Sequence, residues 1–316
     1  MVVFLYNMLK SYIMSNSRYV NLLFIMIASV SCKRDLIKSP AFEVRTNKLE
    51  YKVGDSARFV FSGEPDIITF YSGEPGYEYQ YRDRTEVDGG LTQLEFSSRV
   101  LYGSQTNNLR VVASTDFSGV YDSANIRSAT WKDISTRFKL ATAASGALSD
   151  VTASGKADIS DLVLKGMPLY LAYQYVGDKP PATTPTQRTW RIQSFSLTNT
   201  LPSGIMSTLA TLTSAGWIPV DVVNPANKWT VAADMLQFAP NSTLLASEDW
   251  IITKPLFVTR VSPDKGVAIK EFSQRRDSYT YAFARPGKYK ITFVASNVNA
   301  TDQKTVVKEV ELNIIP

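Results

Sequence analysis

Apolar and polar residues alternate near both ends of the chain. Residues 49–61 alternate in two runs separated by a Gly54-Asp55 turn, and residues 289–295 and 310–314 alternate near the C-terminus. Because successive side chains of a strand point to opposite faces, this period of two predicts half-buried strands. The few strands at either end need a second sheet to cover their apolar face. The pattern therefore predicts that both ends of the chain build one sandwich.

The same pattern predicts an all-β protein with one sandwich split in sequence. Residues 42–84 and 278–316 are expected to form this sandwich, and residues 85–277 are expected to form a second β domain inserted between its strands. Termini that lie close together make such an insertion tolerable. The alternative is that the two ends are unrelated β segments of one large sandwich.

The inserted residues also have the pattern of strands. Short runs rich in aromatic and β-branched residues are bounded by Gly, Pro, Asn, Asp and Ser. Residues 169–176 are apolar on both faces apart from Gln174, which predicts a central strand covered on both sides. Residues 177–187 are rich in proline and predict a loop, because proline removes backbone donors from a sheet. Together these runs predict a jelly-roll-like sandwich.

The N-terminus has the pattern of a secretory signal. Arg18 precedes an apolar run over residues 22–28, and small residues then lead to Cys32, the only cysteine. This run is too short to span a bilayer. The stretch "SVSC" resembles a lipobox, which implies cleavage before Cys32 and acylation of its thiol; the alternative is a buried or incidental cysteine. We therefore expect a signal peptide over 1–31 and a lipid-anchored tether over 32–41.

Charge and missing residue types exclude several functions. The formal net charge of +5 is spread along a chain of mixed acids and bases, which argues against a nucleic-acid partner. The chain has no histidine, so catalysis by Ser-His-Asp or Cys-His groups and HExxH metal sites are excluded. There is no P-loop and no GxGxxG motif. We expect a protein that is not an enzyme; the remaining enzymatic alternative is a glycosidase with two carboxylates.

Two sets of motifs resemble known β modules. The stretches "YKVGDSARFVFSG" and "PGKYKITFVASN" resemble the early and late strands of polycystic-kidney-disease-type Ig-like domains. The stretches "ASTDFSGVYDSANIRSATWKDIS", "LYLAYQYVG" and "SEDWIITKPL" are similar to signatures of cleaved-adhesin or choice-of-anchor jelly rolls, which belong to the galactose-binding-like class. The resemblance implies a split Ig-like sandwich with an inserted jelly roll.

The chain from Cys32 onward also resembles an uncharacterised family of Bacteroidetes lipoproteins that are encoded with SusC/SusD-type glycan uptake systems. This resemblance implies a protein anchored by lipid in the outer membrane, at the cell surface. Its implied partners are a polysaccharide or other glycan and the SusC/SusD-type transporter. No catalytic residue can be transferred from the family.

Two tryptophans are the leading candidates for a carbohydrate platform. Trp217 and Trp229 flank a loop rich in Asn, Asp and Pro, which includes Asn224 and Asn227. Aromatic faces stack on sugar rings, and neighbouring amides bind hydroxyls. The alternative for tryptophan is packing in the core, which we expect for Trp190 and Trp250.

Three tyrosines form a second candidate platform. Tyr77, Tyr79 and Tyr81 alternate with polar residues, so an extended segment would present all three on one face. The favoured alternative is that these tyrosines pack at the junction between the two predicted domains.

Three aspartates are candidate metal ligands. Asp116, Asp122 and Asp133 would supply oxygen ligands to a structural Ca²⁺, which jelly rolls of the resembled class often carry. The alternative is that they stabilise turns. No other cofactor is expected.

Two functions remain open at this point. The first is non-catalytic capture of glycan beside an outer-membrane transporter. The second is adhesion or structural spacing through a protein partner. An exposed aromatic pair in a groove favours the first function, and a flat tyrosine-rich patch favours the second.

Overall fold

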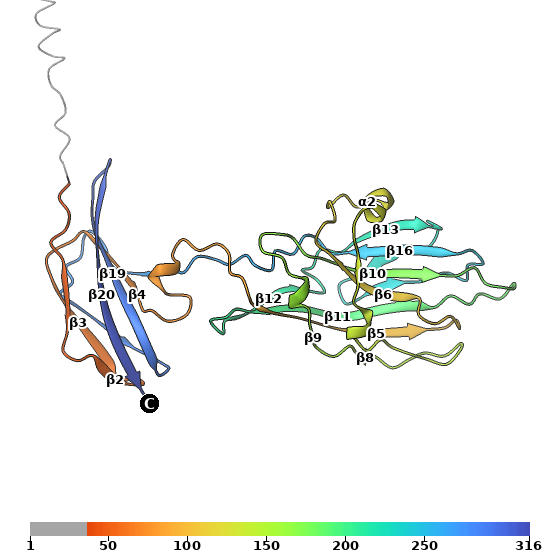
Figure 1. The fold of residues 1–316 in the computed structure, drawn as a ribbon, viewed down its shortest axis with the longest axis horizontal. Helices are drawn as coiled ribbons and strands as arrows, with labels where there is room; N and C mark the ends of the chain where they lie inside the picture. The colour runs from red at the N-terminus through yellow and green to blue at the C-terminus, as the bar shows by residue number, and fades with distance from the viewer. Residues whose placement is uncertain (1–36) are drawn as a thin grey trace, which may run out of the picture. The chain divides into compact units, whose positions relative to one another are not determined.

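The structure is a computed structural model that describes residues 37–316. The expected signal peptide and the predicted acylation site at Cys32 lie outside the described residues. Within these residues the chain divides into two compact units (Figure 1). The terminal unit holds the described residues up to Phe70 together with Ala268–Gly287 and Phe293–Pro316, and the inner unit holds Tyr71–Val267 and Lys288–Thr292.

Two sheets form the terminal unit. The first has the strand order β1 (Glu43–Thr46), β3 (Ser56–Ser62), β18 (Ser278–Ala282). The second has the order β17 (Val267–Lys270), β4 (Ile67–Tyr71), β19 (Gly287–Val298), β20 (Gln303–Ile315), β2 (Glu50–Lys52). Strand β18 pairs antiparallel with β3, so strands from the two ends of the chain are hydrogen-bonded to each other. Strand β2 runs parallel to β20.

The alternation in the sequence sets the core of this unit. In β3, Ala57, Phe59 and Phe61 are buried and the residues between them are exposed, so the predicted period of two is confirmed there. The ring of Phe293 lies 5.1 Å from that of Phe59 and 5.3 Å from that of Phe61, measured between centroids. One core therefore contains side chains from both ends of the chain.

Two further sheets form the inner unit. One has the order β13 (Ile218–Val223), β16 (Ser247–Ile252), β10 (Tyr170–Gly177), β6 (Leu109–Ser114), β7 (Lys132–Asp133). The other has the order β14 (Trp229–Val231), β15 (Leu236–Phe238), β11 (Thr189–Thr200), β5 (Leu91–Leu101), β8 (Thr152–Ala153), with β12 (Met206–Thr211) paired to β11 and β9 (Ala157–Asp158) paired to β5. Their facing sides enclose the main hydrophobic core.

Strand β10 is central and covered on both faces, as the sequence predicts. It lies between β16 and β6. On its inner face Tyr173 and Tyr175 belong to the main core, and on its outer face Tyr170 and Ala172 belong to a second hydrophobic cluster.

Residues 115–131 cover part of the outer face of this sheet. They include the short helix α2 (Ser123–Ser128), which begins where the carboxylate of Asp122 accepts a hydrogen bond from the backbone amide of Asn125. Phe117 contacts Tyr170 at 5.1 Å between ring centroids. The segment thus buries apolar residues on the outer face of β10.

The other described helices are the single turns η1 (Tyr79–Tyr81), η2 (Ser135–Arg137) and η3 (Ser160–Leu162). Within residues 37–316, no helix has both the length and the apolar character needed to cross a membrane. The described chain is almost all β and arranged as sandwich-like sheets, so the all-β prediction is confirmed. Its closer assignment to Ig-like and jelly-roll folds stays a prediction.

Candidate functional site

The tryptophan platform predicted from the sequence is wrong. Trp217 is only 8% exposed and Trp229 only 2% exposed, and both belong to the main core of the inner unit. Their rings lie 5.5 Å and 6.3 Å from that of Tyr173, and the indole of Trp217 donates to the carbonyl of Leu212 at 3.0 Å. Because both indoles fill space between the sheets, neither face is open to a sugar. The expected burial of Trp190 and Trp250 is confirmed.

The two asparagines that accompany these tryptophans stabilise loops instead. Asn224 has a left-handed backbone with φ of 65°, and its amide donates to the hydroxyl of Thr243 at 3.1 Å. Asn227 is buried and accepts a hydrogen bond from Asn241 at 3.3 Å. Their amide groups therefore hold the loop after β13, and the prediction that they join Trp217 and Trp229 in one exposed site is wrong.

The tyrosines of residues 77–81 do not share one exposed face. The segment forms turns and η1 rather than a strand, so the alternation in the sequence has no structural counterpart. Arg82 lies over the ring of Tyr79 at 4.1 Å, and Arg84 lies over the ring of Tyr81 at 3.8 Å. These cations cover faces that a sugar would need.

Tyr77 has a different position from the other two tyrosines. It is exposed and lines a cavity of about 470 Å³. The same cavity contains Arg84, whose guanidinium lies 3.1 Å from the carboxylate of Asp264. Tyr77 is therefore the exposed tyrosine of the three, whereas Tyr79 and Tyr81 are half-buried.

The three aspartates predicted as Ca²⁺ ligands are not assembled into a metal site. Asp122 caps α2, and Asp133 accepts a hydrogen bond from the backbone amide of Ser135 at 2.9 Å. Asp116 accepts from the hydroxyl of Ser114 at 2.7 Å. Within residues 37–316, no group of three or more His, Cys, Asp and Glu side chains is placed to hold a metal ion. These aspartates instead stabilise turns and a helix start, as the alternative predicts.

Lys132 and Asp133 line two different cavities at the β7 edge of the five-stranded sheet of the inner unit. In β7, Lys132 pairs with Ala113 and Asp133 pairs with Val112 of β6. Since paired residues share a face, Lys132 lies on the side of the main core and Asp133 lies on the outer side. One short strand thus supplies a cation to the first cavity and a carboxylate to the second.

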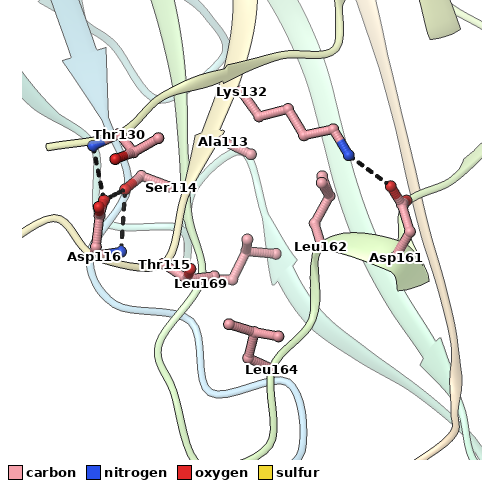
Figure 2. Close-up of a pocket in the computed structure, with 10 residues that line it drawn as sticks. All are labelled: Ala113, Ser114, Thr115, Asp116, Thr130, Lys132, Asp161, Leu162, Leu164 and Leu169. Carbon is pink, nitrogen blue, oxygen red and sulfur yellow. Dashed lines mark hydrogen bonds and ion pairs between the residues drawn. The ribbon is translucent and has the colours of Figure 1, made fainter.

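The first, which we name the Lys132 cavity, has a volume of about 340 Å³ (Figure 2). Its leucine side chains lie between two polar groups, as Figure 2 shows: Asp116 with Ser114 and Thr130 on one side, and Lys132 with Asp161 on the other. The lining residues are Ala113, Ser114, Thr115, Asp116, Thr130, Lys132, Asp161, Leu162, Leu164 and Leu169.

Both carboxylates of the Lys132 cavity hold their negative charge. The hydroxyl of Ser114 and groups of Thr130 donate hydrogen bonds to Asp116, and these bonds lower its pKa. Arg137 donates two hydrogen bonds to Asp161, at 2.6 Å and 2.8 Å, and Lys132 donates one at 2.9 Å. These bonds lower the pKa of Asp161. A glycosidase with two carboxylates needs one that keeps its proton near neutral pH, and neither of these does.

The second, which we name the Arg110 cavity, has a volume of about 500 Å³. Its base is apolar and buried, and its rim is polar. The buried apolar residues are Val100, Leu109, Phe138, Ala141 and Trp190, and the polar residues are Gln105, Thr106, Asn107, Arg110, Asp133, Ser135, Thr136, Thr142 and Arg188. Asp133 is the only carboxylate among these described lining residues.

Two arginines give this cavity its charge. Arg188 is buried and donates to the carbonyls of Gln105 at 2.7 Å, Tyr102 at 3.1 Å and Ala143 at 2.9 Å. It therefore holds two loops that wall the cavity. Arg110 is half exposed, and its Nε lies 3.9 Å from the carboxylate of Asp133. This long ion pair leaves the Arg110 guanidinium accessible for a ligand.

No sequence pattern marks Arg110 or Arg188 as a site residue. Arg110 stands in an ordinary alternating strand, and Arg188 follows the proline-rich loop without a motif. The two arginines line the same cavity only because Arg188 binds both loops that wall it.

Both cavities lie within the part of the chain that identifies its family. No curated protein matches the chain. Residues 31–217 match the family described as "Domain of unknown function (DUF5017)", and this range contains every lining residue of both cavities. Since the match extends over more than half of the 316 residues, the chain belongs to the DUF5017 family.

Proposed function

We propose that this protein is a non-catalytic lipoprotein that captures glycan, and that the Arg110 cavity is its sugar site. The observation that carries this proposal is the division of the cavity into an apolar base and a polar rim. Sugar rings have apolar C–H faces and hydroxyl edges, so they need both kinds of wall. The volume of about 500 Å³ is in the range of small-molecule sites.

The rim offers groups that match sugar hydroxyls. Arg110 supplies donors, Asp133 supplies acceptors, and the hydroxyl of Thr136 supplies both. Phe138 and Trp190 lie at the apolar base, and both side chains are largely buried in the main core, so the base offers apolar contact and no open stacking platform. Because the cavity has a single carboxylate, it supports binding in preference to hydrolysis by a carboxylate pair.

The cellular part of the proposal rests on sequence resemblance. The lipobox-like segment before Cys32 supports a lipid anchor, and the likeness to lipoproteins encoded with SusC/SusD-type systems supports a place at the outer-membrane surface beside a glycan transporter. Ig-like and jelly-roll architectures fit this role, because one β unit would act as a spacer and the other would carry the ligand. We propose no nucleic-acid partner.

A glycan array tests the function. The chain from Lys33 onward contains all described residues and is the suitable probe. Binding to a single sugar unit is expected to be weak and to strengthen with glycan length as further units engage. If no glycan binds and a protein partner binds tightly, adhesion is the function.

Variants test the cavity. Arg110→Ala removes a charged donor and is expected to weaken binding about tenfold or more. Thr136→Trp is expected to block the cavity, because Thr136 is exposed at its rim. Arg127→Ala, an exposed arginine on α2 that lines neither cavity, is the matched control and should bind like the wild type. Wild-type affinity in both cavity variants would place the site elsewhere.

A further inference from the structure

The side chain of Asp249 is an unpartnered carboxyl group inside the inner unit. It lies in β16 with none of its surface exposed, and neither carboxylate oxygen has a hydrogen-bond partner among the described residues. A buried charge without a partner is strongly destabilising, and buried polar groups are normally hydrogen-bonded. We therefore expect Asp249 to have a partner that is not part of the described chain.

A second carboxylate lies next to it. Asp221 of β13 is the direct cross-strand partner of Asp249. Directly opposed residues of antiparallel strands point to the same face, with their Cβ atoms about 4.5–5.5 Å apart. Asp221 is exposed because β13 is the edge strand of its sheet. The pair therefore has one buried carboxyl group and one that solvent reaches.

A buried serine and an indole lie beside the pair. Ser247 lies two residues before Asp249 on the same face of β16 and is buried. Trp229 donates from its indole to the backbone carbonyl of Asp249 at 3.4 Å. A register shift of the ladder follows Asp221, and such bulges re-aim side chains beside functional sites.

We propose that Asp221 and Asp249 together bind a divalent cation of the Ca²⁺ type at the β13–β16 edge. A cation that replaces the proton of Asp249 bridges the two carboxylates and gives the orphaned oxygens of Asp249 a partner. Ca²⁺ binds six to eight oxygen ligands in flexible geometry, so waters entering beside Asp221 can complete its shell. Mg²⁺ demands near-ideal octahedral geometry, which a fixed buried carboxyl group meets less easily.

The number of protein ligands sets the expected affinity. The described chain has no group of three or more acidic, His or Cys side chains at one metal position, so Asp221 and Asp249 are the only two carboxylate ligands proposed here. Dissociation constants of about 10⁻⁴–10⁻³ M are typical of weak extracellular Ca²⁺ modules. The cation should therefore bind at millimolar concentrations and exchange readily.

Proton binding competes with the cation. Burial, followed by the negative charge and the close carboxyl group of Asp221 and then by the negative charge of Glu248, raises the pKa of Asp249 to about 8. Tyr175 of β10 lies opposite Asp249 on its other side and stays neutral, since burial raises its pKa too. A cation that binds at pH 7 must displace the proton of Asp249, so apparent affinity should increase as the pH rises toward 8.

Thermal unfolding in the presence of CaCl₂ tests the proposal. The purified protein is first treated with EDTA and then melted at pH 7.5 with 0 to about 10 mM CaCl₂, a range chosen to span the expected dissociation constant. The melting temperature of the wild type should rise as CaCl₂ increases. The rise should be absent in Asp249→Asn and in Asp221→Asn. Asp234→Asn, an exposed aspartate of the same unit, should respond like the wild type.

Terbium luminescence is a second measurement that does not depend on stability. Tb³⁺ replaces Ca²⁺ at oxygen sites, and Trp229 is close enough to sensitise its emission. Wild type and Asp234→Asn should show emission that CaCl₂ quenches by competition, and Asp221→Asn should not. Since Asp221 is exposed, this variant keeps the test valid even if Asp249→Asn fails to fold.

A wild-type melt that depends on pH but not on CaCl₂ would show a carboxyl pair sharing a proton, and the proposal would be wrong. A calcium response that persists in both carboxylate variants would also overturn it.

Discussion

The rings of Phe59 and Phe293 lie 5.1 Å apart between centroids, at an angle of 62°, in the core of the terminal unit. Phe59 belongs to β3 near the start of the chain, and Phe293 belongs to β19 near its end. Edge-to-face aromatic contacts of this kind add to the stability that burial gives. The core of this unit is therefore complete only when both ends of the chain are present.

Replacing Phe293 with alanine should destabilise the terminal unit. The ring contacts Phe59, Phe61 and Phe70, so its loss leaves a large cavity. We expect the free energy of unfolding to fall by about 3–5 kcal/mol, measured by chemical denaturation. Val60→Ala, on the exposed side of β3, is the control and should change it little. Equal effects of the two substitutions would contradict the shared core.

Replacing Arg188 should loosen the walls of the Arg110 cavity. Arg188→Ala leaves the carbonyls of Tyr102, Gln105 and Ala143 without their donor, and we expect a loss of about 2–4 kcal/mol in unfolding free energy. Hydrogen exchange in residues 102–107 should accelerate as well. Arg188→Lys should restore part of the stability, because an ammonium group reaches fewer carbonyls than a guanidinium group. Unchanged exchange in both variants would show that Arg188 does not hold the loops.

Asp249 should make stability depend on pH when no divalent cation is present. Its pKa is raised from 3.8 to about 8 in the folded protein, so the folded state binds more protons than the unfolded state between these values. Stability from the protonated carboxyl group is thus full below about pH 4 and is lost progressively as the pH rises through about 8.

Asp249→Asn removes this titration. In EDTA, the unfolding free energy of the variant should therefore increase relative to the wild type as the pH rises from 5 to 8. Asp234→Asn should follow the wild-type profile. Parallel profiles for the wild type and Asp249→Asn would exclude a raised pKa at Asp249.

Cys32 should carry the membrane anchor. Two acyl chains hold a protein stably on a bilayer, whereas a single chain binds only marginally. Cys32→Ser should therefore release the protein into the soluble fraction, and mass spectrometry of the wild type should show a lipid mass on the N-terminal peptide. Retention of the serine variant in membranes, together with an unmodified wild-type Cys32, would contradict the anchor.

Local periodicity made the strands predictable. The buried Ala57, Phe59 and Phe61 and the doubly covered β10 follow from side-chain alternation and from an apolar run, which are properties of neighbouring residues. Trp190 and Trp250 were also expected in the core because each stands within such a run.

The candidate sites depended on distant contacts and were not predictable in the same way. Trp217 and Trp229 border polar loops in sequence, yet the sheet that contains β14 and the sheet that contains β13 enclose both indoles. The tyrosines of residues 77–81 alternate like a strand, but turns and cation contacts decide their positions. Local pattern carries no information on which side chain from another strand or loop will cover a given face.

The sequence by itself determined that the described chain is almost all β, because the alternation of apolar and polar side chains is a property of neighbouring residues. Only the tertiary structure decided which polar residues meet. Arg110 and Arg188 line one cavity because Arg188 holds the two loops that wall it. Asp221 lies opposite Asp249 because of the register between β13 and β16, two strands joined by a long connection. The physical reason is that pairing and burial depend on residues far apart along the chain, whereas alternation depends only on neighbours.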